Sequence, residues 1–143
     1  GIMEEIKQTL RASRMLNKAY ECCRSYWHEF IMPEHLLLVL TEEFNFNKAL
    51  NIFYSPYKLQ DRIHDYLESV ETLSEGTEYV PEPSAQMSKV IEMAVQSVVS
   101  SSAGELDIPH LVRGLLALEE AASNWHHKRR RVVSLLWRSG SDT

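Results

Sequence analysis

The chain has 143 residues, of which 44% are hydrophobic, and its formal net charge is −5 at pH 7. This length fits one compact domain or two small half-domains with a shared core, and the composition excludes a disordered chain. The charge is uneven: residues 1–127 carry 10 Lys and Arg against 19 Asp and Glu (−9), whereas residues 128–143 carry five basic residues and one acidic residue (+4). An acidic body argues against nucleic acid as the main partner, because phosphate contacts need a cationic face.

Neither a membrane span nor a secretion signal is predicted. The longest apolar runs, such as residues 36–40, are far shorter than the roughly 20 residues that cross a bilayer. No signal-peptide pattern opens the sequence. The adjacent Cys22 and Cys23 lie in a helix-like stretch, where they are poorly placed to pair with each other, and free thiols are typical of a reducing compartment. The expected localisation is therefore cytoplasmic.

Helical periodicity dominates the first half of the chain. Apolar residues at three- and four-residue spacing, among them Ile6, Leu10 and Leu16, predict the first helix. Pro33 suits the first turn of the second helix, where its missing N–H costs nothing, and this helix is expected to be buried because it is apolar on several sides. Asn45 is expected to cap the third helix. The four predicted helices cover residues 3–24, 33–42, 47–54 and 57–70.

The second half begins with a linker. Residues 71–83 contain one glycine, two prolines and four glutamates, a composition that interrupts helices. Ser84 is a suitable N-cap for the helix that follows, and Asp107 can cap the next buried helix. The helices predicted here cover residues 85–98 and 108–118, with two further pieces between 119 and 139. No β alternation is found, so the fold class is all-α with about eight helices.

The chain also repeats itself. Residues 31–40 recur in altered form as residues 106–115, and His110 takes the place of His35 at an offset of 75 positions. The upstream helix keeps this offset, because Ala19 falls on Ala94 without a gap. Two equal spacings indicate a tandem duplication. The predicted organisation is a single domain over residues 1–143, with repeat one over about 3–70, the linker over 71–83 and repeat two over about 84–139.

Motifs for nucleotide binding and catalysis are missing from the sequence. None of the five glycines begins a phosphate-binding loop, so this chain is not expected to bind a nucleotide itself. His28 and Glu29 start a zinc-protease pattern, but position 32 is Met instead of the second histidine. Glu34 and His35 are not accompanied by a nucleophile motif. We therefore expect no catalytic residue, no metal and no cofactor in this chain.

The histidines and the basic run each leave an alternative open. His35 and His110 are interpreted as structural imidazoles that hydrogen-bond a backbone group, with a metal or catalytic role as the alternative. A metal-dependent enzyme would instead use His28, His126 and His127, and it would bind zinc through at least three protein ligands. The basic run is interpreted as a solvated helix face, and a partner-docking patch or a nucleic-acid patch are the alternatives. Its residues are Lys128, Arg129, Arg130 and Arg131.

Taken together, these residues match a known family. A helix with the L-x-x-A pattern of Leu16 and Ala19 leads to His28-Glu29-Phe30 and then to the run at residues 33–38, and the pattern repeats after an acidic Pro-Ser linker. The chain resembles the N-terminal domain of the Clp/Hsp100 AAA+ unfoldases, and among the subfamilies it is most similar to ClpA. The resemblance extends from Glu5 to about Gly140. It implies a pseudo-two-fold bundle of two four-helix repeats.

The resemblance also implies a function. ClpA-like unfoldases feed substrates to the ClpP peptidase, and their N-terminal domains dock the adaptor ClpS. The fragment would be monomeric and non-catalytic, tethered to a hexameric ATPase ring that binds ATP and Mg²⁺ outside this chain. Its partners would be a ClpS-like adaptor and protein substrates, with neither nucleic acid nor membrane.

The matching positions define an expected docking face. Residues 25–32 form the connector between the first two predicted helices. Carboxylates on this connector and on a first helical turn can accept charged hydrogen bonds while half-solvated. As alternatives, Glu29 is an ordinary surface charge, Glu34 complements the helix dipole, and Ser84 only caps its helix. A rival function is a peptide-binding chaperone module of a disaggregase- or secretion-type relative, which would expose an apolar groove. The residues expected to bind the partner are Glu29, Glu34, Ser84, Arg129, Arg130 and Arg131.

Overall fold

The computed structural model describes residues 6–123 of the chain. Six helices are found in this part: α2 (Leu10–Ser25), α3 (Pro33–Leu40), α4 (Phe44–Leu50), α5 (Pro56–Ser69), α6 (Ala85–Ser100) and α7 (Ile108–Ser123). Four strands of two residues each lie between them: β1 (Lys7–Gln8), β2 (Phe30–Ile31), β3 (Glu82–Pro83) and β4 (Glu105–Leu106). The all-α class predicted from the sequence is confirmed.

The helix boundaries follow from capping residues. The Ser84 hydroxyl accepts a hydrogen bond from the Met87 N–H at the start of α6, and Thr9 does the same for Ala12 at the start of α2. Helices α3 and α5 both have proline in the first turn, where no N–H is needed. These caps make the breaks between helices local properties of the sequence.

Several predicted boundaries are wrong. The first helix begins at Leu10 instead of Met3, because Thr9 is its cap and the two residues before Thr9 pair as a strand. The third helix is Phe44–Leu50 and is capped by Glu43, whose carboxylate accepts from the N–H groups of Asn45 and Phe46. Helix α7 continues without a break past position 119 to Ser123. The helical pieces predicted beyond that residue lie outside the described part of the chain.

The duplication is visible in the backbone. Adding 75 to the residues of β1 and β2 gives those of β3 and β4, and the pairs cross between repeats: β1 pairs with β4 and β2 with β3, both in parallel. Trp27 and Ser102, also 75 apart, are the two non-glycine residues with positive φ in the described part, at 59° and 57°. The pseudo-two-fold repeat predicted from the resemblance is therefore present.

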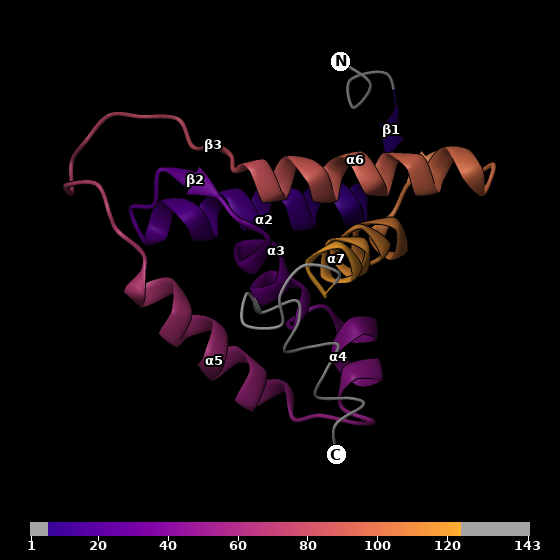
Figure 1. The fold of residues 1–143 in the computed structure, drawn as a ribbon, viewed down its shortest axis with the longest axis horizontal. Helices are drawn as coiled ribbons and strands as arrows, with labels where there is room; N and C mark the ends of the chain where they lie inside the picture. The colour runs from indigo at the N-terminus through magenta and orange to yellow at the C-terminus, as the bar shows by residue number, and fades with distance from the viewer. Residues whose placement is uncertain (1–5, 124–143) are drawn as a thin grey trace.

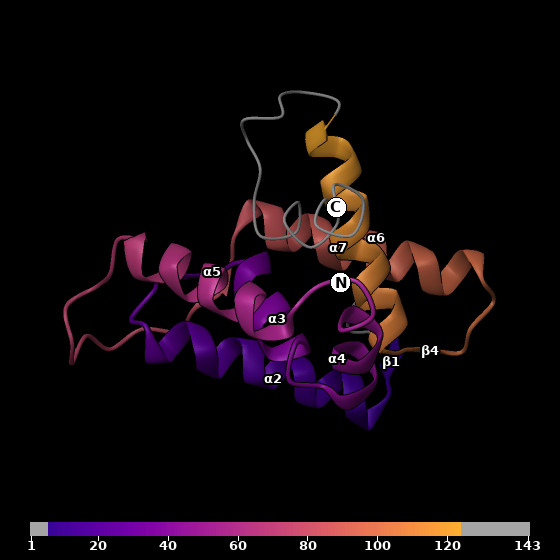
Figure 2. The same ribbon diagram turned by 90° about the horizontal axis from the view of Figure 1, so that it is seen from below.

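The two repeats share one core. Figures 1 and 2 show α2 and α6 running in opposite directions, as a two-fold relation requires. Helix α3 packs on α2 and α7 packs on α6, and α2 also contacts α7 while α3 contacts α6. Helix α5 packs on α3. Every residue of α3 is buried as a result, including Leu36, Leu37 and Leu40.

Candidate protein-docking site

His35 organises the start of α3. Its side chain is fully buried, and its Nδ1 accepts a hydrogen bond of 2.8 Å from the backbone N–H of Met32. Because Nδ1 is an acceptor, the proton of this neutral imidazole resides on Nε2, which lies 2.8 Å from Nδ1 of His28. One imidazole thus links the connector, the helix start and a second buried ring.

His28 completes a stack of rings under the connector. It is only 1% exposed, and the Tyr26 ring stacks on it with centroids 5.1 Å apart. Burial lowers the pKa of His28, and the nearby Leu67 backbone partly offsets this. Burial, and then the neighbouring His28, lowers the pKa of His35 to about 3. Both rings are therefore neutral at pH 7.

This pair should make the domain sensitive to acid. Both histidines have a lower pKa in the folded than in the unfolded chain, so the unfolded chain binds more protons below pH 6.5. The contribution of this pair to stability is therefore constant above that pH and falls as the pH drops toward the folded pKa of His35, by about 2 kcal/mol at pH 5. Urea unfolding at pH 7.5 and pH 5 measures the loss. A His35→Gln variant should show a smaller pH dependence, and equal stability of the wild type at both values would contradict the prediction.

The predicted exposure of Glu34 is wrong. This residue was expected to be half-solvated and to face a partner, but its side chain is 0% exposed. The reason is that α3 is covered along its whole length, and the first helical turn faces inward with the rest. A carboxylate in this position is not accessible to a partner in the described conformation.

Glu29 and Ser84, in contrast, lie at opposite ends of the parallel β2·β3 pair. Glu29 is exposed and directly precedes β2, while Ser84 is half-buried and directly follows β3. The Ser84 N–H donates to the Ile31 carbonyl at 2.9 Å, which joins the two segments. Phe30, 44% exposed, lies between them and is level with Glu82. Residues Glu29, Phe30, Glu82 and Ser84 are called the strand-pair face below.

The linker contributes to the same region, which the sequence interpretation did not foresee. The Tyr79 hydroxyl donates to the His28 carbonyl at 2.8 Å, and the Leu73 N–H donates to the Trp27 carbonyl at 2.8 Å. Arg24 donates to the Tyr79 carbonyl and lies over its ring. The only sequence signal for these contacts was the presence of Tyr79 in an otherwise acidic, proline-containing stretch. The linker is therefore held against the connector that carries Glu29.

The second repeat keeps the same capping geometry with different partners. His110 Nδ1 accepts from the Asp107 N–H at 2.9 Å, as His35 does from Met32. The Asp107 carboxylate accepts from the Thr9 hydroxyl at 2.7 Å, so a cap of repeat two is bonded to a cap of repeat one. The Ile108 N–H also donates to this carboxylate, at 2.8 Å. Burial alone would raise the pKa of Asp107, but the hydrogen bonds from Thr9 and Ile108, together with the nearby Arg11 and His110, hold it below its usual value.

Some residues predicted to be functional lie outside the described part of the chain. Arg129, Arg130 and Arg131 lie outside residues 6–123, as do His126 and His127. Among the described residues, no three His, Cys, Asp or Glu side chains gather as a metal site would require. In the same part, no helix combines the length and apolar character of a membrane span.

Solved structures share this fold. A protein of a malarial protein secretion system superposes with a TM-score of 0.66 at 20% identity, covering 96% of this chain and 97% of that one. The Hsp104 N-terminal domain from Candida albicans gives 0.66 at 16% identity, with coverages of 94% and 81%. The N-terminal domain of the chaperone ClpD from Arabidopsis thaliana gives 0.62 at 19%, with coverages of 94% and 92%. No curated protein sequence matches significantly.

The fold therefore defines a two-repeat helical domain of the kind that the Clp/Hsp100 unfoldases carry at their N-termini. A sequence model of the Clp repeat (R) N-terminal domain matches residues 7–128. The chain belongs to this family, which is a non-catalytic N-terminal domain of AAA+ proteins. The family predicted from the sequence is confirmed, whereas similarity to ClpA in particular remains a prediction.

Proposed function

We propose that this domain docks adaptors and substrates for a ClpA-like ATP-dependent unfoldase that feeds the ClpP peptidase in the cytoplasm. Its adaptor would be a ClpS-like protein. The isolated domain would be monomeric, and ATP and Mg²⁺ would bind to the hexameric ring of the parent protein. The proposal is supported by the family and, above all, by the strand-pair face, where Glu29 and Ser84 come from different repeats and lie at opposite ends of the β2·β3 pair, with the exposed Phe30 ring between them.

The Ser84 hydroxyl group can donate a hydrogen bond at this face. Its oxygen accepts from Met87, and within the described residues no acceptor takes its proton. The equivalent Thr9 gives its proton to Asp107, but the residue equivalent to Asp107 in the other repeat is Met32, which has no carboxylate. An acceptor on a partner can take this place, while Glu29 and Glu82 attract basic groups around the apolar Phe30.

A charge reversal at Glu29 tests the face. Glu29→Lys is expected to weaken binding of the cognate ClpS-like protein about tenfold, because like charges would then meet across the interface. Glu29 is exposed, so the fold should be unaffected. Isothermal titration calorimetry measures the affinity, and Glu105→Lys on β4, the repeat equivalent of β2, is the matched control. Unchanged affinity for the Glu29 variant would remove Glu29 from the interface.

Binding of the adaptor itself is the broader test. A pull-down of a ClpS-like protein by the wild-type domain separates the ClpA-like function from those of other Clp/Hsp100 members. If the adaptor does not bind at any accessible concentration, the ClpA assignment is wrong while the family remains.

One observation favours a second function, a substrate-sensing module that binds apolar peptides as a chaperone. A groove of about 460 Å³ lies where α2, α4 and α7 meet, and its lining includes Phe46, Ile108 and Val112. It therefore joins residues of both repeats and gives the rival function an apolar surface. Val112→Asp should abolish the binding of an unfolded apolar polypeptide, measured by fluorescence anisotropy, without affecting adaptor binding if the two functions use separate surfaces.

A further inference from the structure

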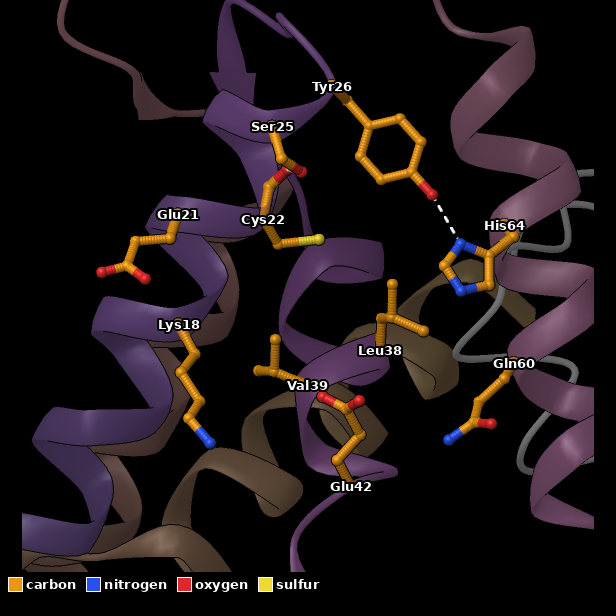
Figure 3. Close-up of a pocket in the computed structure, with 10 residues that line it drawn as sticks. All are labelled: Lys18, Glu21, Cys22, Ser25, Tyr26, Leu38, Val39, Glu42, Gln60 and His64. Atoms are coloured by element: carbon orange, nitrogen blue, oxygen red, sulfur yellow. Dashed lines mark hydrogen bonds between the residues drawn. The ribbon is translucent and has the colours of Figure 1, made fainter.

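A second groove lies between α2, α3 and α5 of repeat one (Figure 3). It encloses about 530 Å³ and contains none of the residues of the strand-pair face. Leu38 and Val39 of α3 form its apolar floor together with Cys22 of α2. At one end the Tyr26 hydroxyl bonds Nδ1 of His64 at 2.5 Å and so joins α2 to α5. The groove is therefore a packed, bounded surface with an apolar base.

Glu42 supplies the charge of the groove. Figure 3 shows its carboxylate pointing back over Val39 and Leu38. Burial, and then this carboxylate, raises the pKa of the Cys22 thiol to about 11, so the thiol stays uncharged. On the rim, Lys18 and Glu21 have opposite charges, and within the described residues no cation forms an ion pair with Glu42. The groove thus carries a net negative charge above an apolar floor.

The duplication shows that the fold does not require these residues. Repeat two keeps the caps, the left-handed turn and the histidine of repeat one. Yet the position equivalent to Glu42 is Ala117, that of Cys22 is Ser97 and that of Tyr26 is Ser101. A copy of the same helix pair folds without the acidic and aromatic lining. Tyr26 is explained by its stacking on His28, but the charge of Glu42 is a property of repeat one that the shared fold does not require.

We propose that this groove binds the lysine or arginine side chain of a polypeptide partner. Such a side chain has an aliphatic stem and a cationic end, which match an apolar floor beside a carboxylate. The stem would lie over Leu38 and Val39, and the cation would bond Glu42. Gln60 also lines the groove and donates its amide N–H to Thr41 at 3.0 Å. The site is additional to the adaptor face.

Two peptides distinguish charge recognition from simple apolar binding. A short peptide with one arginine between two leucines is titrated into the full chain, and the same peptide with citrulline, which is neutral and nearly isosteric, serves as the control. We expect the arginine peptide to bind roughly fivefold more tightly. Amide NMR shifts should change at Cys22, Val39 and His64. Equal affinity of the two peptides, or no binding of either, would overturn the proposal.

Two variants locate the effect. Glu42→Gln should abolish the preference for arginine, whereas Glu92→Gln, the same change on an exposed helix position of repeat two, should preserve it. Equal losses in both variants would indicate general attraction to an acidic domain and would contradict a site at Glu42. If Glu42→Gln instead shifts the amides of residues 128–131 without any peptide, the basic run of this chain occupies the groove, and the proposal of a separate partner is wrong.

Discussion

Replacing His35 with alanine is expected to lower the free energy of unfolding by about 3 kcal/mol. The change removes the acceptor for the Met32 N–H and the hydrogen bond to His28. Met32 is half-buried and His28 is buried, so both lose this partner away from bulk solvent. It also opens a cavity at a fully buried position. For a domain of this size the melting temperature should fall by roughly 10 °C.

The repeat supplies a matched control. His110→Ala removes the same kind of capping hydrogen bond, but His110 is half-buried, and Ala103 stands where repeat one has His28. Its loss should therefore be about 1 kcal/mol, the usual effect of one cap. His35→Gln keeps an acceptor at the capping position and should restore part of the stability. Equal melting temperatures for the His35→Ala and His110→Ala variants would show that the buried imidazole pair contributes nothing beyond capping.

The parts of the fold that were predictable depend on local chemistry. Ser84 was recognisable as an N-cap and Pro33 as a first-turn residue because each satisfies the backbone within a few positions. The offset of 75 residues was recognisable because the duplication preserved spacing as well as residue type. Together with the resemblance, these features predicted the family and the class of fold.

The features that were missed depend on contacts between distant segments. A strand of two residues has no alternation to detect, so the pairing of β2 with β3 was invisible until the repeats were folded together. For the same reason the burial of His28 against Tyr26 and His35 was not predicted from the sequence. Glu34 was misjudged because a charged residue in a first helical turn usually faces solvent.

The two candidate docking surfaces differ in which repeats form them. Of the residues predicted from the resemblance, Glu29 and Ser84 lie at the two ends of the strand-pair face, which is assembled from both repeats. The groove at Glu42 is formed within repeat one alone and has no counterpart in the equivalent residues of α6 and α7. Duplication thus preserved the scaffold, while the surfaces of the two copies diverged.

The close packing of α7 on α6 in the second repeat depends on Gly114. Gly114 lies on α7 where this helix crosses α6, and a Cβ atom placed there would lie 2.4 Å from the Val90 carbonyl oxygen and 3.1 Å from its Cγ1. The first of these atoms belongs to the backbone, so it cannot move aside without displacing α6. In repeat one the equivalent position is occupied by Val39.

Gly114→Ala is therefore expected to destabilise the domain by about 3 kcal/mol, although alanine is the better helix former by about 1 kcal/mol. Gly104→Ala is the matched control, because a Cβ there meets no atom within 4 Å, and its stability should be unchanged. Urea unfolding of both variants gives the comparison. A Gly114→Ala variant as stable as the wild type, or more stable, would mean that α6 and α7 separate at little cost. Val90→Ala combined with Gly114→Ala should not restore stability, since the nearest atom is the carbonyl oxygen, which every residue carries.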